Sequence, residues 1–506
     1  MINSTPEWIS RSVSRLRSVV PAVDNAAGGD GTASKPADKP ARAAAVDGSV
    51  TDVVAKTAVP RSTHERLVAT LRRGQEALSP RALRRLLADL QEVVAPQVSE
   101  LEGGRRAQAV AQWYAAAQPE ERRDMWLLMC EQFAPDATRF KSARQRYEAA
   151  AGTAEEGQAE ISLRRALVSP RTRLLQRFAV FPEGMRFLVD MRAELLPVLK
   201  SDKRLLALDA ELEQLFSTWF DVAFLELRRL SWDSPASLLE KLIKYEAVHD
   251  IRSWADLKNR LDSDRRCYGF FHPRLPNEPL IFVEVALLDR ISSSITPLLD
   301  EAAAPVDITR ANTAIFYSIS NTQTGLRGVS FGDSLIKHVV ETLAAEFPRL
   351  RTFATLSPIP GFRAWLGKNA PAMLERLDDK RRAELGRAVG FEPPQAAHFL
   401  AAVDKPLELD AKSPARQMLL ECAAHYLGRD LQDGKPCDAV ARFHLGNGAR
   451  VERLNWGGDP SAKGLKQSYG LMVNYLYDLK RIDKHRAMLA QGKLPVSGEI
   501  ESLLRG

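Results

Sequence analysis

Residues 313–366 constrain the fold more than any other stretch of this 506-residue chain. Residues 314–320 are mostly β-branched and aromatic, which is typical of a half-buried strand. Gly325, Gly328 and Gly332 follow in a loop where no side chain blocks a close approach to the backbone. Apolar residues then recur at helical spacing until a proline closes the run. The sequence therefore predicts a strand, a glycine-rich loop and a helix in succession.

Such a unit can bind an anion, because backbone N–H groups and the positive end of the helix dipole meet at the loop. The simplest alternative is an ordinary strand–helix–strand crossover. The glycine spacing lacks the G-x-G opening of dinucleotide-binding loops. It is closer to the R/Q-x-x-G-x-G/A pyrophosphate loop of the GCN5-related N-acetyltransferase (GNAT) fold. Here Arg327-Gly-Val-Ser-Phe-Gly332 has Ser330 where glycine is usual. The pattern indicates coenzyme A (CoA).

Several further motifs carry a more specific resemblance. They are Ser318-Ile-Ser, Gln323-x-Gly-Leu-x-Gly-Val, Leu335-Ile-Lys, Glu346-Phe-Pro, Leu356-Ser-Pro-Ile-Pro-Gly-Phe-x-x-Trp365, Phe443-His-Leu-x-Asn-Gly-Ala449, Asn455-Trp456 and Gly470-Leu-Met-Val-Asn-Tyr-x-Tyr477. In this order they resemble the malonyl-CoA decarboxylase family, over about residues 215–480. The resemblance implies a carboxy-lyase that converts malonyl-CoA to acetyl-CoA and carbon dioxide. We expect no metal or separate cofactor, because CoA is part of the substrate and its thioester accepts the electrons.

The rest of the chain predicts two domains after a tail. Residues 1–60 are rich in alanine, glycine and proline, and we expect them to be disordered. Residues 61–215 form helix-period segments, with starts such as Ser79-Pro80, and predict an all-α bundle. Residues 216–506 contain the predicted strands. The expected class is α+β, a helical bundle domain followed by a GNAT-like mixed-sheet catalytic domain.

Two later segments are expected to complete the sheet region. Val440–Leu445 and Ala449–Leu454 flank Gly446-Asn-Gly448 and predict a β-hairpin. Gly470–Leu479 is consistent with a terminal helix or strand, and we favour a helix.

Two residues are candidates for the chemistry. Ser357 ends a predicted strand and is followed closely by two prolines, which fix the backbone. His444 lies between two apolar residues. Residue type alone favours a turn serine and a structural histidine. The family resemblance implies instead that His444 is the general acid to the enolate and Ser357 its partner on the carboxylate side.

The resemblance also implies substrate contacts. Ser318, Tyr477 and Asn455 are expected to line the malonyl pocket. The CoA pyrophosphate is expected on the loop formed by Gly325, Leu326, Arg327, Gly328, Val329, Ser330, Phe331, Gly332 and Asp333. Family members have glutamate where Ser330 stands, so no acidic role is expected at that position.

Composition narrows the function classes. Hydrophobic residues make up 45% and charged residues 27%, as in soluble globular proteins, and no apolar run is long enough to span a bilayer. The net charge of +7 is spread without basic blocks, which does not favour nucleic acid. Four isolated cysteines favour a reducing compartment.

We expect a bacterial cytoplasmic protein rather than one of the mitochondrial matrix. The resemblance implies a homo-oligomer, a dimer or tetramer, formed through the helical domain.

Two alternatives stay open at this point. The first is a GNAT-type CoA-dependent acyltransferase, because fold does not fix function. The second is a helical scaffold that binds acyl-CoA without chemistry. Neither alternative requires the Ser357 and His444 pair.

Overall fold

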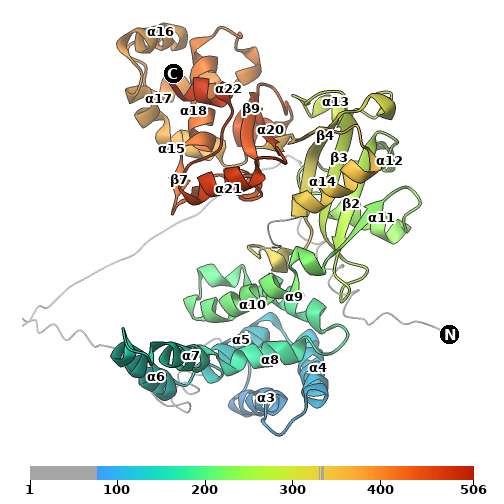
Figure 1. The fold of residues 1–506 in the computed structure, drawn as a ribbon, viewed down its shortest axis with the longest axis vertical. Helices are drawn as coiled ribbons and strands as arrows, with labels where there is room; N and C mark the ends of the chain where they lie inside the picture. The colour runs from blue at the N-terminus through green and yellow to red at the C-terminus, as the bar shows by residue number, and fades with distance from the viewer. Residues whose placement is uncertain (1–76, 330, 332–334, 506) are drawn as a thin grey trace, which may run out of the picture. The chain divides into compact units, whose positions relative to one another are not determined.

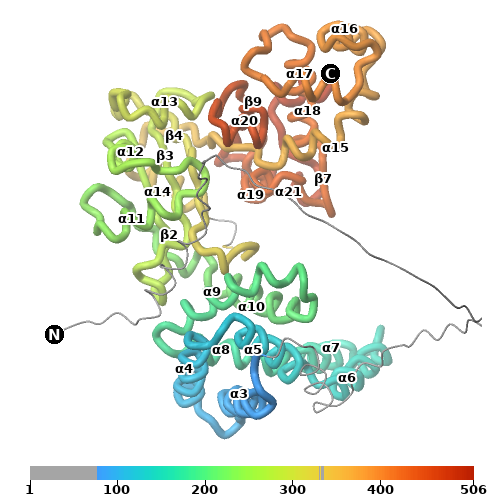
Figure 2. Tube along the Cα trace, turned by 180° about the vertical axis from the view of Figure 1, so that it is seen from behind, coloured from blue at the N-terminus to red at the C-terminus, as the bar shows by residue number. Residues whose placement is uncertain are grey.

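The computed structural model describes residues 77–329, 331 and 335–505, so the expected disorder of residues 1–60 lies outside the described residues. The chain divides between Arg177 and Phe178 into two compact units (Figures 1 and 2). This division falls earlier than the boundary expected near residue 215. That boundary remains a prediction from the sequence.

The first unit is helical over its described residues. Its helices are α3 (Pro80–Val93), α4 (Glu100–Ala116), α5 (Pro119–Gln132), α6 (Ala137–Ala150), α7 (Glu156–Leu167) and α8 (Pro170–Phe178), which runs one residue past the division. The predicted start at Ser79-Pro80 is confirmed, since the Ser79 Oγ accepts a hydrogen bond from the Ala82 N–H at 3.3 Å. Leu83, Leu86 and Leu90 form the buried face of α3.

The second unit opens with helices α9 (Gly184–Leu195) and α10 (Leu206–Trp219) and contains an eight-stranded sheet. The strand order is β1-β2-β3-β4-β5-β10-β6, and β9 pairs with β10. The strands are β1 (Glu226–Leu230), β2 (Arg265–Phe271), β3 (Pro279–Leu288), β4 (Thr313–Asn321), β5 (Thr352–Thr355), β6 (Ser357–Pro358), β9 (Arg450–Asn455) and β10 (Met472–Leu476). Only β4 and β5 pair in parallel among these described strands. The predicted α+β class with a mixed sheet is confirmed.

Helices surround and follow this sheet. They are α11 (Ala236–Tyr245), α12 (Trp254–Arg260), α13 (Thr296–Leu299), α14 (Leu335–Glu346), α15 (Phe362–Glu375), α16 (Asp379–Val389), α17 (Ala396–Val403), α18 (Pro414–Gly428), α19 (Ala439–Gly446), α20 (Ala462–Ser468), α21 (Ile482–Ala490) and α22 (Gly498–Arg505). A short hairpin joins β7 (Leu431–Gln432) to β8 (Lys435–Pro436), and a 3-10 turn, η6, covers Thr324–Leu326. In Figure 1, α14 lies across the sheet, and α15, α17, α18 and α22 gather in the C-terminal part.

Strand alternation separates two faces of the sheet near its parallel pair. Ile315, Tyr317 and Leu356 point to one face, where they share a buried apolar cluster. Phe316 is paired in register with Thr355, and both point to the opposite face. Because Ser357 follows Thr355 by two residues, its hydroxyl belongs to that second face.

Two predicted elements are wrong. His444 lies on helix α19, not on a strand, although the following strand β9 is confirmed. The Asp438 carboxylate begins this helix by accepting hydrogen bonds from the N–H groups of Val440 and Ala441, at 2.9 and 3.0 Å. This capping outweighs the strand propensity of the apolar residues around His444.

The second error concerns Gly470–Leu479, where we favoured a helix and the structure has strand β10. Tyr469 and Gly470 both adopt positive φ, 55° and 74°, and so end helix α20. The strand then fills the space between β5, β6 and β9. Tertiary pairing therefore decides the conformation of this segment.

Candidate active site

Ser357 and His444 meet in the second unit. The Ser357 Oγ lies 3.3 Å from the His444 Nε2, although 87 residues separate the two in the sequence. β6 places Ser357 against β10, while α19 carries His444 in its last turn. Both side chains are buried, with 6% and 3% of their surface exposed. The two segments are therefore folded so that the predicted pair is in hydrogen-bonding contact.

Tyr477 holds the other side of the imidazole. Its hydroxyl lies 2.7 Å from the His444 Nδ1. The backbone N–H of Tyr477 donates to the Phe353 carbonyl at 2.9 Å, and its ring packs edge-on against Phe316. Tyr477 is therefore fixed to the sheet by its backbone and its ring, and its hydroxyl is aimed at the imidazole.

A direction can be assigned to this hydrogen-bond chain. The Ser357 hydroxyl donates to the Thr355 Oγ1 at 2.9 Å, which leaves the serine oxygen to accept from the His444 Nε2–H. The Nδ1 then accepts from the Tyr477 hydroxyl. The chain runs from Tyr477 through His444 and Ser357 to Thr355, with the imidazole proton on the side of the serine.

Burial controls the charges of these groups. It lowers the pKa of His444 to about 3, so the imidazole is neutral near pH 7. Burial also raises the pKa of Tyr477 well above its usual value, so the phenol keeps its proton. At neutral pH the site therefore holds an uncharged hydrogen-bond chain.

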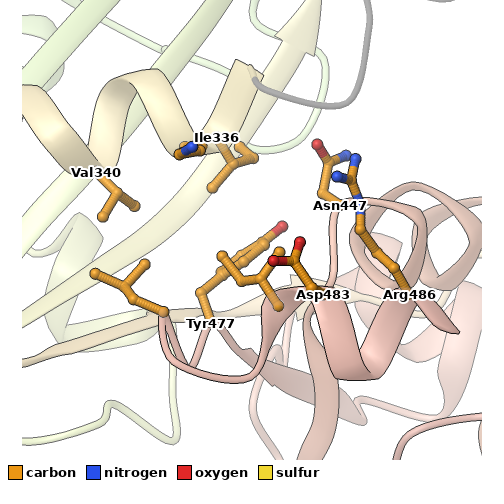
Figure 3. Close-up of a pocket in the computed structure, with 9 residues that line it drawn as sticks. Ile336, Val340, Asn447, Tyr477, Asp483 and Arg486 are labelled. Atoms are coloured by element: carbon orange, nitrogen blue, oxygen red, sulfur yellow. The ribbon is translucent and has the colours of Figure 1, made fainter. Parts of the chain in front are cut away.

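A cavity of about 130 Å³ opens beside Tyr477. Figure 3 shows Ile336 and Val340 reaching it from α14, and Asp483 and Arg486 from α21. Tyr477 both lines this cavity and contacts His444, so this tyrosine separates the cavity from the buried pair.

The glycine-rich loop after β4 is described in part. Gly325 and Leu326 are buried in η6, Val329 is buried, and Arg327 and Gly328 are exposed. The Phe331 carbonyl accepts from the Val222 N–H at 2.9 Å. Ser330, Gly332 and Asp333 lie outside the described residues.

Comparison with known proteins identifies the family. The family model for the malonyl-CoA decarboxylase C-terminal domain matches residues 223–506, and the N-terminal domain model matches residues 133–220. The mitochondrial malonyl-CoA decarboxylase of Mus musculus is 37% identical over 367 residues, which cover 69% of this chain and 73% of that protein. The chain belongs to the malonyl-CoA decarboxylase family.

Solved structures of malonyl-CoA decarboxylases agree with this membership. The structure from Cupriavidus metallidurans is 43% identical, with a TM-score of 0.70, and the match covers 84% of this chain and all of that one. The structure from Rhodopseudomonas palustris is 40% identical, with a TM-score of 0.71 and coverage of 83% and 99%. Within the described residues, every helix is too short or too polar to cross a membrane.

The structure does not bring Ser318 to Ser357 and His444. The Ser318 hydroxyl donates to the Glu246 carboxylate at 2.7 Å. Ser318 stands opposite Glu284 and Phe316 stands opposite Val285, so the register of β3 and β4 shifts by one residue between these pairs. Because Glu284 and Val285 are consecutive and point to opposite faces, this bulge puts Ser318 on the sheet face away from Phe316 and Ser357. Its expected place in the malonyl pocket therefore has no support from these contacts.

Asn455 lies in an outer layer of the site. Its Nδ2 donates to the Asn474 Oδ1 at 2.8 Å, and the Asn474 Nδ2 donates to the Thr355 carbonyl at 2.7 Å. Asn455 therefore supports the strand that carries Thr355, and its expected contact with substrate remains a prediction.

Sequence reasoning missed two residues that contact Ser357 and His444. Thr355 accepts hydrogen bonds at its Oγ1 from the Ser357 hydroxyl and from the Tyr475 N–H, at 2.9 and 3.1 Å. The Tyr475 ring stacks on the His444 imidazole with 4.7 Å between centroids. The two-residue period of strands offers a signal for both, because Thr355 precedes Ser357 by two positions and Tyr475 precedes Tyr477 by two.

Proposed function

We propose that this carboxy-lyase decarboxylates malonyl-CoA at the hydrogen-bond chain formed by Tyr477, His444 and Ser357. The observation that carries the proposal is the 3.3 Å contact between the Ser357 Oγ and the His444 Nε2. A partner on the far side of the imidazole, 2.7 Å away, supports a role in proton transfer. The cavity beside Tyr477 supports entry of the acyl group from that side.

Decarboxylation leaves a carbanion equivalent to be protonated. The bond between the carboxylate and the α-carbon breaks, carbon dioxide departs, and the electron pair enters the thioester as an enolate. A proton added to the α-carbon then gives acetyl-CoA. The site must therefore stabilise negative charge on the thioester oxygen and supply one proton.

His444 supplies that proton as a neutral imidazole. Its pKa of about 3 means that no imidazolium is present beforehand. A thioester enolate is a far stronger base than an imidazole or phenol anion, so the Nε2–H is acidic enough to protonate it. As the Nε2 gives up its proton, the Nδ1 takes one from the Tyr477 hydroxyl. After acetyl-CoA leaves, a proton from solvent binds to Nε2 and Nδ1 returns its proton to the Tyr477 oxygen, so that one solvent proton is consumed and the starting tautomer is restored.

Ser357 acts on the carboxylate side. With substrate bound, its hydroxyl can donate to the malonyl carboxylate in place of Thr355 and so fix the orientation of the bond that breaks. The side chain is buried, so water does not compete for this hydrogen bond. This burial and the contact with His444 support the proposed role of Ser357 as the hydrogen-bonded partner of the acid.

The glycine-rich loop is the proposed site for the CoA pyrophosphate. Exposure of Arg327 and of the Gly328 backbone supports this assignment, because both are accessible to a phosphate that binds from solvent.

We also propose that the chain forms a homo-oligomer, a dimer or tetramer, through the helical domain. Light scattering coupled to gel filtration tests it, and a monomer would contradict it.

Turnover without an acceptor tests the reaction. The purified chain is incubated with malonyl-CoA and no amine, and carbon dioxide and acetyl-CoA are measured. We expect both products in equal amounts. Turnover only when an amine is added would favour the acyltransferase, and tight binding without turnover would favour the acyl-CoA scaffold.

A further inference from the structure

A buried arginine on α9 contacts the backbone of the proposed CoA loop. Arg192 is 1% exposed, and its Nη1 donates to the carbonyls of Gly325 and Arg327, at 2.8 and 2.9 Å. Its Nε donates to Asp209 of α10 at 2.8 Å, and its Nη2 donates to Glu213 at 3.4 Å. The guanidinium therefore joins two helices to two carbonyls of one loop.

These contacts decide which way one peptide of the loop faces. In a trans peptide the C=O and the following N–H point in opposite directions. Because the Arg327 carbonyl points to Arg192, the Gly328 N–H points away from it. Gly328 is exposed, and its N–H has no hydrogen-bond partner among the described residues. Its φ of 83° is one that a side chain would make unfavourable.

The neighbouring N–H groups are already used within the loop. The Leu326 N–H donates to the Gln323 carbonyl, the Arg327 N–H to Thr324 and the Val329 N–H to Leu326, at 3.0 to 3.1 Å. The Gly328 N–H is therefore the donor that this part of the loop leaves for an anion.

Helix α9 contacts the loop at two further points. The Arg186 Nη1 donates to the Gln323 Oε1 at 2.8 Å. A Cβ placed on Gly325 would lie 1.9 Å from the Val189 carbonyl oxygen, so only glycine allows the loop to come this close to α9. Arg192 therefore acts from a helix that is already packed tightly against the loop.

We propose that Arg192 is a positioning residue that locks the Arg327–Gly328 peptide with its N–H facing out, where it donates to the CoA pyrophosphate. The reverse orientation would present the Arg327 carbonyl to the phosphate and repel it. The proposal rests on the proposed function, because that assigns the loop to CoA. It gives α9 and α10 a part in substrate binding.

Binding of CoA itself tests the proposal without requiring turnover. Calorimetry on the full chain compares CoA with pantetheine, which lacks the pyrophosphate and the nucleotide. A hydrogen bond to a charged group corresponds to about 10- to 100-fold in affinity. We expect Arg192→Met to weaken CoA binding by this factor and to leave pantetheine binding unchanged. Arg192→Lys, which keeps a cation able to reach a carbonyl, should recover part of the loss.

A matched control removes another buried arginine that donates to two carbonyls. Arg171, 3% exposed, donates to the Met129 and Cys130 carbonyls at 3.3 Å each. Arg171→Met should lower stability without changing CoA affinity.

A second variant covers the case in which Arg192→Met does not fold. Asp209→Asn weakens the hydrogen bond that holds the same guanidinium, and its CoA affinity is measured in the same way. Unchanged CoA affinity in the Arg192 or Asp209 variant, or equal losses for CoA and pantetheine, would overturn the proposal. CoA binding by a wild-type chain that does not decarboxylate malonyl-CoA would refute only the reaction.

Discussion

Replacing Tyr477 by phenylalanine tests the proton path most selectively. The change deletes the hydroxyl that lies 2.7 Å from the His444 Nδ1 and keeps the ring that packs against Phe316. The backbone hydrogen bond from Tyr477 to Phe353 is also kept. The fold should therefore survive, while the imidazole loses its fixed tautomer and its source of a second proton.

The size of the effect follows from the burial of the imidazole. A buried ring nitrogen left without a partner costs about 1–3 kcal/mol, and each 1.36 kcal/mol in the barrier changes the rate tenfold. We therefore expect Tyr477→Phe to lower kcat about 10- to 100-fold. KM for malonyl-CoA should change little, because the pyrophosphate loop is untouched. Steady-state kinetics with malonyl-CoA measures both quantities.

Tyr475 supplies the matched control. Its ring stacks on the same imidazole, and its hydroxyl has no hydrogen-bond partner in the described part of the chain. Tyr475→Phe therefore removes the same group two residues earlier in the chain and leaves the hydrogen bonds of the proposed proton path intact, so kcat should stay within about twofold. Equal losses in the two variants, or full activity in Tyr477→Phe, would refute the reasoning.

Three further predictions concern the support of the site and the response to pH. Thr355→Val removes the acceptor for the Ser357 hydroxyl, and we expect kcat to fall about tenfold with circular dichroism unchanged. Asp438→Ala removes the cap of α19, and thermal unfolding should show a loss of about 1–2 kcal/mol. Burial lowers the pKa of His249 to about 4. As pH falls from 6.5 to 4, His249 binds a proton in the unfolded chain but stays neutral in the folded chain. The free energy of unfolding therefore falls over this range. Urea unfolding at pH 7 and at pH 4.5 measures how much stability is lost between the two pH values. We expect this loss to be smaller by about 2 kcal/mol in His249→Gln than in wild type.

Much of the sheet could be predicted from local sequence patterns. Residues 279–288 and 313–321 are strands because their apolar and β-branched runs suit burial on both faces. Helix α14 follows from one apolar face at helical spacing. The helix of His444 differs from the predicted strand because Asp438 is a good N-cap, and its hydrogen bonds outweigh the strand propensity of the apolar residues after it.

The site could be predicted only where family motifs named its residues. Ser357 and His444 are far apart in sequence, and no local pattern pairs them. Arg192 gives no sequence signal, because its loop partners are backbone carbonyls more than a hundred residues away. Ser318 shares the motif region, and regular alternation from Phe316 would put it on the face of the site, but a β-bulge between Phe316 and Ser318 turns its hydroxyl to the other face of the sheet.

The central claim, that His444 protonates the enolate, is tested most directly by the turnover of His444→Ala. Release of carbon dioxide and formation of acetyl-CoA from malonyl-CoA are measured for the variant and for wild type, together with thermal unfolding of both. We predict a loss of about 10²-fold or more in kcat with a folded variant. A folded His444→Ala that forms acetyl-CoA at the wild-type rate would contradict the account.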